Sequence, residues 1–400
     1  MRAAGIICEC NPLHAGHQYL IEQARGSGAD VIVCVMSGCF VQRGEAAIAD
    51  GFLRSRALLH GGADAVLELP FPYSASSAEF FARAGVEILS RIGADEVWFG
   101  SESGDLAALQ RAAEIADSEA FRAAYANEIR GNGGTAQTYF DCLYRSGAES
   151  ASVSPNDILA ISYLRAIRAS GGVLTPRTVK RHGDGFRDGT VGSAFPSATA
   201  LRALLRTGGI EAAKLYLTEE TATLLDDAIG QGRAPADLAH VERGILSWFR
   251  SASAERIERI AEIGGGLGLR MQEAAREATT LSELLSLAST KKYTTARLQR
   301  GILFALTGIE EADLSARPAY VRLLAANGIG CGFLAGCRKK SDLAIVTRRA
   351  DLPDTEEARR QAEWEARAWE LYTLCMPRTA SAQTLWKYTP FILPEGRSDA

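Results

Sequence analysis

The chain has 400 residues, which is enough for two or three domains. Hydrophobic residues make up 47% and charged residues 23%, so a wholly disordered chain is excluded, and no apolar run is long enough to predict a membrane helix. The net charge of −4 excludes a globally basic nucleic-acid binder but leaves room for local basic patches. Eight cysteines without a CxxC pair, and an N-terminus without a secretory signal, predict a reduced protein of the cytoplasm.

Strands alternate with helices over residues 2–100. Apolar and β-branched runs predict the strands, and helical spacing of apolar residues predicts the helices between them. In chain order these are a strand at Arg2–Cys10, a helix at Gly16–Gly26, a strand at Asp30–Gly38, a helix at Phe52–Leu59, a strand at Ala65–Leu69, a helix at Ala78–Ile92 and a strand at Glu96–Gly100. The alternation predicts an α/β fold with a doubly wound parallel sheet and a site at the carboxyl ends of its strands.

Beyond Ser103 the pattern is mostly helical. Helices are predicted at Leu106–Ala116, Glu119–Arg130, Gln137–Tyr144, Asn156–Ala169, Ser197–Arg206 and Thr355–Leu374, and short strands at Pro176–Arg181 and Leu343–Val346. Helices also dominate from Ile210 to Gly308. We therefore expect a first domain over residues 1–208 and a mostly α-helical C-terminal region over residues 209–400.

The most informative string is CNPLHAGH, residues 10–17, between the first predicted strand and the first predicted helix. Backbone N–H groups and the positive end of the helix dipole meet at such a junction, which makes it an anion site. His14 and His17 face the same side of the first helical turn, where imidazole N–H groups can hold phosphate oxygens. Gly16 would let a base or phosphate approach the backbone closely.

Two other interpretations of this string are open. One is a surface turn with two solvated histidines, which the pairing of the histidines at a strand–helix junction makes less attractive. The other is a zinc site in which His14 and His17 join Cys8, Cys10 or Glu9. Because both cysteines belong to a buried strand, we expect no metal ion held by the protein alone.

HxGH after a strand and Asn-Pro resembles the signature of the nucleotidylyltransferase superfamily, whose fold is a Rossmann-like, HIGH-type sheet. A second superfamily element, S-x-T-x-x-R, appears as SATALR at residues 197–202. In the superfamily this element binds the β- and γ-phosphates of a nucleotide. Standing alone, Ser197 would be read as an ordinary helix N-cap.

Further strings resemble the bacterial tRNA(Met) cytidine acetate ligases. They are GIICECNPLHAGHQYLI (5–21), MSGCFVQRGEAAIAD (36–50), DAVLELPFPYSASSAEFFARAGVEIL (64–89), FGSESGD (99–105), SPNDILAISYLRAI (154–167), VKRHGDGFRDG (179–189) and KKYTTARLQRGIL (291–303). They occur in the family's order and span residues 2–308, with a looser likeness over 318–347.

The resemblance implies an enzyme that uses ATP and Mg²⁺ to activate acetate as acetyl-adenylate and then acetylates N4 of the wobble cytidine of elongator tRNA(Met). It implies His14, His17 and Arg202 as catalytic residues. The ATP-binding residues that it implies are Ile7, Cys8, Glu9, Cys10, Asn11, Pro12, Leu13, His14, Ala15, Gly16, His17, Gln18, Tyr19, Leu20, Gly100, Asn156, Arg181, Ser197 and Thr199.

The basic string near residue 291 is the candidate tRNA contact. Its residues are Lys291, Lys292, Tyr293, Arg297 and Arg300, with no acidic residue among them. If the segment is helical, the tyrosine and the two arginines share one face. A second basic cluster lies at residues 338–340 and 348–349. A solvated basic face is the plain alternative for both.

Two departures from the family pattern concern Gly51, where relatives commonly have Lys, and the FRD string at 186–188, where they often have YHD. Arg54 or Arg56 would be in reach to replace the lysine.

Two other functions are open: a nucleotidyltransferase acting on a small molecule, and an RNA-binding protein that keeps a silent nucleotide pocket. The residues alone do not give the oligomeric state or the acyl donor.

Overall fold

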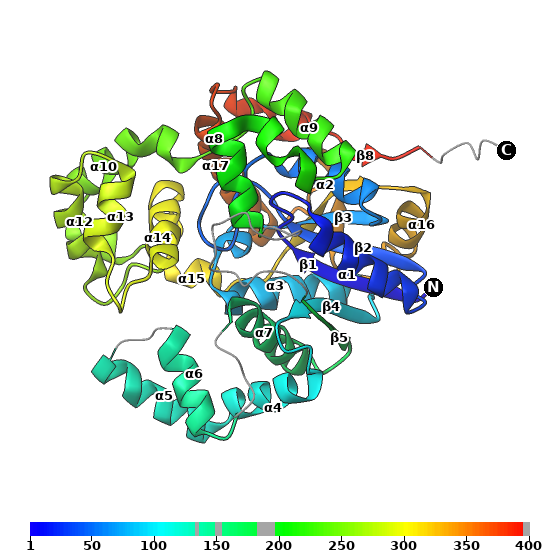
Figure 1. Ribbon diagram of the computed structural model, residues 1–400, viewed down its shortest axis with the longest axis horizontal. Helices are drawn as coiled ribbons and strands as arrows, with labels where there is room; N and C mark the ends of the chain where they lie inside the picture. Colours follow the sequence, from blue (N-terminus) through cyan, green and yellow to red (C-terminus); the bar gives the residue numbers. More distant parts are fainter. Residues whose placement is uncertain (133–135, 149–153, 182–196, 395–400) are drawn as a thin grey trace.

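The structure is a computed structural model that describes residues 1–132, 136–148, 154–181 and 197–394 (Figure 1). Its strands are β1 (Ala3–Cys8), β2 (Val31–Ser37), β3 (Ala65–Leu69), β4 (Glu96–Ser101), β5 (Thr175–Lys180), β6 (Tyr320–Ala326), β7 (Ala344–Val346) and β8 (Phe391–Ile392). Within the described ranges they form one sheet in the order β5-β4-β1-β2-β3-β6-β7, and β8 pairs with β6.

Strands β1 to β5 are parallel to one another, so their carboxyl ends lie at one edge of the sheet. The strand order reverses at β1, because β2 and β3 lie on one side of it and β4 and β5 on the other. In open α/β sheets the crevice at such a reversal is where ligands bind. The α/β fold predicted from the sequence is confirmed, and it places a crevice at the ends of β1 and β4.

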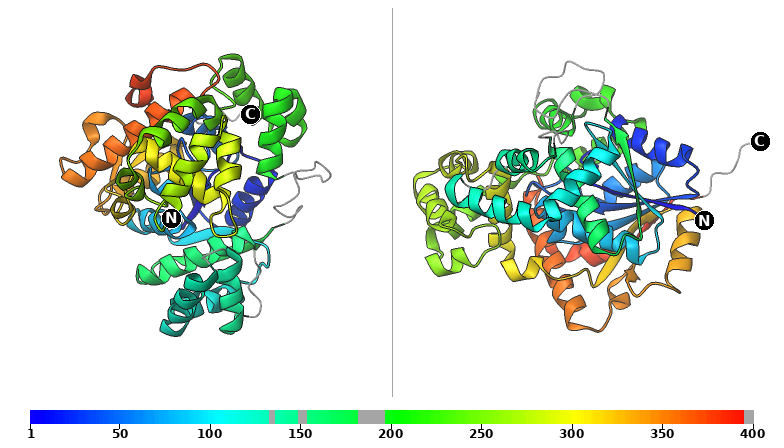
Figure 2. Two further views of the ribbon diagram at one scale, coloured as in Figure 1. Left: turned by 90° about the vertical axis from the view of Figure 1, so that its left-hand side faces the viewer. Right: turned by 90° about the horizontal axis from the view of Figure 1, so that it is seen from below.

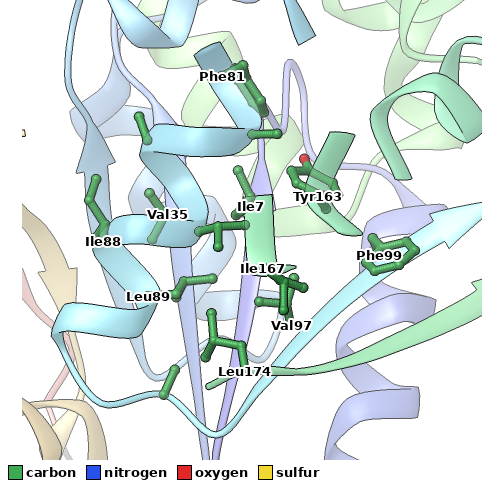
Figure 3. Close-up of a cluster of buried hydrophobic side chains, with 14 of the residues drawn as sticks. Ile7, Val35, Phe81, Ile88, Leu89, Val97, Phe99, Tyr163, Ile167 and Leu174 are labelled. Carbon is green, nitrogen blue, oxygen red and sulfur yellow. The ribbon is translucent and has the colours of Figure 1, made fainter. Parts of the chain in front are cut away.

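Helices cover both faces of the sheet because side chains alternate along each strand. Val33 and Val35 of β2 face a core shared with α3 (Ala78–Arg91) and α7 (Pro155–Ala169) (Figure 3). Cys34 and Met36 face the opposite core, under α1 (Ala15–Gly26) and α2 (Gly51–His60). Every residue of β1 and β2 is buried, as expected for parallel strands covered on both sides.

The remaining helices include two groups (Figures 1 and 2). The first, α4 (Leu106–Asp117), α5 (Glu119–Asn132) and α6 (Ala136–Arg145), extends from α7. The second, here called the helical lobe, comprises α10 (Glu242–Ser251), α11 (Ala254–Glu258), α12 (Leu267–Glu277), α13 (Leu281–Ala288) and α14 (Thr295–Thr307). The others are α8 (Ala198–Ala213), α9 (Glu219–Gly230), α15 (Glu311–Leu314), α16 (Gly328–Cys337) and α17 (Glu356–Cys375). No helix of the described chain is both long and apolar enough to cross a membrane.

Strand β6, which is fully buried and antiparallel to β3, was not predicted from the sequence. A short apolar run fits a buried strand and a buried helix equally well, so periodicity cannot tell them apart. Because β6, β7 and β8 extend the sheet formed by β1 to β5, the boundary expected at residue 208 does not separate two cores. The division of function between residues 1–208 and 209–400 stays a prediction.

Candidate active site

The two histidines of the HxGH string form a reciprocal cap at the start of α1. His14 is the N-cap residue, and its Nδ1 accepts a hydrogen bond from the Gly16 amide at 3.1 Å. His17 Nδ1 accepts one from the His14 amide at 3.3 Å, and the two ring centroids are 4.0 Å apart. Since both Nδ1 atoms accept, both neutral rings carry their proton on Nε2, and these N–H groups are available to a ligand.

This cap changes the role expected for Gly16. A Cβ at this position would lie 3.0 Å from His14 Cε1 and 3.1 Å from Nδ1. Glycine is therefore needed so that the His14 ring can lie against the first turn, and the Gly16 amide is used in the cap. An anion bound here would therefore meet the imidazole N–H groups more than the first amides of the helix.

Burial and neighbouring positive charge keep both rings neutral. Burial, followed by the charge of Arg181, lowers the pKa of His14 to about 4. Burial also lowers the pKa of His17 well below its usual value, with further contributions from His14 and Arg181. At pH 7 the site therefore presents two neutral N–H donors beside a permanent cation, an arrangement that attracts phosphate oxygens.

These donors open into a cavity of about 220 Å³ at the carboxyl ends of β1 and β4. Of the residues expected to bind ATP, those that line it are Ile7, Cys8, Glu9, Cys10, His14, His17, Leu20, Gly100, Asn156, Arg181 and Ser197. The expected residues that lie outside the wall are Asn11, Pro12, Leu13, Ala15, Gly16, Gln18, Tyr19, Thr199 and Arg202. The structure thus brings together segments that are up to 190 residues apart in the chain, from Ile7 to Ser197.

The wall opposite α1 comes from β4, α7 and the end of β5. A Cβ on Gly100 would lie 3.1 Å from Arg181 Cγ, so a larger residue would displace the arginine side chain. Asn156 Nδ2 donates to Glu102 Oε1 at 2.5 Å, which fixes the amide at the start of α7. Both positions predicted from the FGSE and PND strings therefore shape the same side of the cavity.

Several cavity residues were not predicted from the sequence, and among them are residues of the hairpin Phe40–Ala46, whose ends form an isolated bridge, and of α3 and α7. Gln42 and Arg43 of the hairpin line the wall, as do Phe81 of α3 and Tyr163 of α7. The hairpin belongs to the VQRGE string, so the resemblance marked the segment without giving a role to its side chains.

Comparison with known proteins identifies the family. Residues 1–385 match the family model described as HIGH Nucleotidyl Transferase. The chain is 31% identical to the tRNA(Met) cytidine acetate ligase of Acetivibrio thermocellus, over 98% of this chain and 100% of that one. It is 34% identical to the protein of that name from Syntrophotalea carbinolica, over 94% of this chain and 95% of that one. The chain belongs to the tRNA(Met) cytidine acetate ligase family.

Solved structures agree with this assignment. The chain resembles the crystal structure of Thermotoga maritima TmcAL with a TM-score of 0.92 and 29% identity, over 99% of this chain and 100% of that one. The TM-score is 0.90 for a second crystal structure of that protein, bound with alpha-thio ATP. The family resemblance inferred from the sequence motifs is confirmed.

The structure places the arginine of the S-x-T-x-x-R element behind the nucleotide loop. Arg202 Nη1 donates to the Asn11 carbonyl at 3.0 Å, and Nη2 pairs with Glu45 Oε2 at 3.2 Å. The side chain is only 7% exposed and does not line the cavity. In this arrangement Arg202 holds the loop after β1 against the hairpin Phe40–Ala46, and direct contact with phosphate stays a prediction.

The family lysine position and its expected substitutes also lie outside the cavity wall. A Cβ on Gly51 would lie 3.4 Å from Gly38 Cα and 3.7 Å from Leu324 Cδ1. Arg54 is 2% exposed and donates to the carbonyls of Glu9, Ser37, Gly38 and Ala49. Arg56 lies over the Phe391 ring, 4.7 Å from its centroid. Neither arginine replaces a lysine at the cavity, and residues 186–188 lie outside the described chain.

Only part of the basic string near residue 291 is presented to solvent. Lys291 and Lys292 are exposed in the loop before α14. Tyr293 is 8% exposed and its hydroxyl donates to the Gly265 carbonyl at 2.8 Å. Arg300 Nε and Nη2 bind both carboxylate oxygens of Glu262, and Arg297 Nε donates to the Glu262 carbonyl. The tyrosine and the arginines thus have internal partners, and the two lysines remain the accessible cations of this string.

No group of three or more His, Cys, Asp and Glu side chains that could hold a metal ion occurs within the described ranges. The free cysteines Cys8, Cys10 and Cys34 are buried together with the core under α1.

Proposed function

We propose that this protein activates acetate with ATP and transfers the acetyl group to N4 of the wobble cytidine of elongator tRNA(Met). The observation that carries the proposal is the cavity at the reversal of strand order, into which two neutral imidazole N–H donors and Arg181 converge. The family membership over nearly the whole chain supports the same reaction.

In the first step an acetate oxygen attacks the α-phosphorus of ATP and pyrophosphate leaves, which yields acetyl-adenylate. His14 and His17 would donate Nε2–H to phosphate oxygens, where negative charge shifts during the in-line displacement. Arg181 and Arg43, both in the wall, would balance the charge of the triphosphate. The protein contributes binding and orientation rather than a covalent nucleophile.

The residues of the cavity fit Mg²⁺ bound mainly through the nucleotide. Of the described side chains in the wall, Glu9 alone is a carboxylate, and its Oε1 accepts from the Gln42 amide at 2.9 Å. Mg²⁺ usually binds through one or two carboxylates, substrate phosphates and water, so Glu9 would be the protein ligand. Bound Mg²⁺ would neutralise phosphate charge.

In the second step the cytidine N4 amine attacks the acetyl carbonyl carbon, AMP leaves, and the amine loses a proton. The target base must leave the anticodon stack to reach the cavity. Lys291 and Lys292 are our candidates for contact with the tRNA backbone, because they are exposed cations with no acidic partner among the described residues. Arg297, Arg300 and Tyr293 would support them by holding the loop in place.

The decisive experiment measures pyrophosphate release from ATP and Mg²⁺ with and without acetate, and then acetyl transfer to bacterial tRNA. Acetate-dependent release in the wild type is the expected result. Replacing His17 with Asn should slow it by two orders of magnitude or more, because a charge-stabilising donor at a developing anion is worth about 10²–10³ in rate. His60→Asn is the matched control, since His60 is exposed at the end of α2 outside the cavity.

Release that ignores acetate would instead support a nucleotidyltransferase acting on another small molecule. ATP binding without any turnover would support a silent nucleotide pocket. Full activity of His17→Asn would contradict the catalytic role of the histidines.

A further inference from the structure

The hydroxyl of Tyr163 is a buried polar group without a hydrogen-bond partner among the residues that the structure describes. The residue is 2% exposed, and its Oη is among the few described buried side-chain atoms that have no partner. Others of this kind, such as Tyr73 Oη and Ser74 Oγ, lie outside the nucleotide cavity. Tyr163 is the one whose side chain lines the cavity wall. Because folded proteins pair nearly all their buried polar atoms, an unpaired hydroxyl at a binding cavity needs an explanation.

The position of Tyr163 on α7 supports a role in ligand binding. Asn156, Leu159 and Tyr163 follow one another at helical spacing, and all three line the cavity. The ring of Tyr163 packs beside Phe99, with centroids 5.6 Å apart, so its orientation is fixed by the core. Figure 3 shows the hydroxyl directed away from Val97, Ile167 and Leu174.

The surroundings of the hydroxyl keep it protonated. Burial raises the pKa of Tyr163 well above its usual value, and the nearby Cys8 and Glu9 act in the same direction. The group is therefore a neutral O–H that can donate to an oxygen of a bound ligand. It lies on the α7 side of the cavity, whereas the His14 and His17 donors come from α1 on the other side of the sheet.

We propose that the Tyr163 hydroxyl is a substrate-binding group of this cavity, which donates a hydrogen bond to an oxygen of the bound nucleotide or of the acetate. The unpaired state of the hydroxyl in the free protein is then a cost that ligand binding removes. The assignment to acetate rests on the proposed function, whereas the assignment to the nucleotide requires only that ATP binds.

Tyr163→Phe tests this inference, because it removes one oxygen and leaves the ring. The dissociation constant for ATP is measured without acetate or tRNA, and the KM for acetate is measured by pyrophosphate release. A hydrogen bond to the nucleotide predicts a dissociation constant about three- to tenfold higher. A hydrogen bond to acetate predicts the same change in its KM with ATP binding unchanged. The thermal midpoint of the free protein should stay the same or rise, because an unpaired buried hydroxyl is lost.

Tyr73→Phe is the matched control, since it also removes an unpaired buried hydroxyl, from a residue outside the cavity. It should leave both constants within twofold of the wild type. Saturating ATP should also raise the thermal midpoint of Tyr163→Phe less than that of the wild type if the bond is to the nucleotide.

The proposal is overturned if Tyr163→Phe keeps both constants within twofold, or if the free variant unfolds at a clearly lower temperature. If the wild type binds ATP but ignores acetate, the proposed function fails and the nucleotide measurement still decides the role of Tyr163.

Discussion

Acidification should destabilise the protein through His14, which is the sharpest test of the capped histidine pair. The pKa of this imidazole is about 4 in the folded chain, because partial burial, followed by the charge of Arg181, disfavours the protonated ring. In the unfolded chain it returns to about 6.5. The unfolded chain therefore binds the proton more readily, and stability is lost as the pH falls from about 6.5 through 4. Above pH 7 the imidazole is neutral in both states and has no effect.

The size of the effect follows from these two values. At pH 5 the unfolded chain is favoured by RT ln[(1 + 10^1.5)/(1 + 10^−1)], which is about 2 kcal/mol relative to pH 7.5. His17 acts in the same direction, since burial also lowers its pKa. A difference of this size is a large part of the stability of a typical domain and is readily measured.

The assay is urea unfolding of wild type and His14→Gln at pH 7.5 and pH 5.0. Over this interval the wild type should lose about 2 kcal/mol more than the variant. ATP should reduce the effect, because phosphate beside the ring raises the His14 pKa. Calorimetry in two buffers should therefore detect proton uptake when ATP binds at pH 5. Equal losses for both proteins would show that His14 titrates normally, and would refute the half-buried, Nδ1-accepting arrangement.

Three further perturbations follow from the structure. Arg54→Met should lower the free energy of unfolding by about 3 kcal/mol or more, measured in urea, because it leaves several buried carbonyls unpaired. Gly44→Ala should weaken ATP binding, since its Cβ would lie 2.4 Å from the backbone of α14. Gly93→Ala is the control: Gly93 has a similar positive φ but open space around its Cβ position, so ATP binding should stay unchanged. Lys291→Glu with Lys292→Glu should weaken tRNA binding and reduce its salt dependence in filter-binding assays; unchanged binding would exclude this loop from the tRNA interface.

The sequence was sufficient to find the centre of the site because its signal is local. Two histidines three residues apart at a strand–helix junction must lie on the same side of the first turn, and the structure places both at the cavity. Gly100, Asn156 and Arg181 could be located only through the resemblance, since nothing in their own spacing indicates that β4, α7 and β5 meet β1 there.

What the sequence did not reveal depends on contacts between distant segments. The burial of Arg202 against Asn11 and Glu45 arises from the packing of α8 on the hairpin Phe40–Ala46, which no helical pattern contains. Likewise, an i, i+4, i+7 pattern grouped Tyr293 with Arg297 and Arg300, but the partner that uses both arginines is Glu262, about 35 residues earlier. Spacing indicates which side chains share a face and does not indicate what covers that face.

The C-terminal half contributes to the nucleotide site by holding the hairpin Phe40–Ala46 in place. Phe40 and Ala46 of the hairpin belong to the core of the helical lobe, while Gln42 and Arg43, between them, line the cavity. Gly44 has a φ of +74° and lies against the backbone of α14, so the hairpin cannot shift toward the lobe. The loop with Lys291 and Lys292 leads directly into that helix. A displacement of this loop would therefore be transmitted through α14 and Gly44 to Arg43. A hairpin without this backbone contact would not move with the loop.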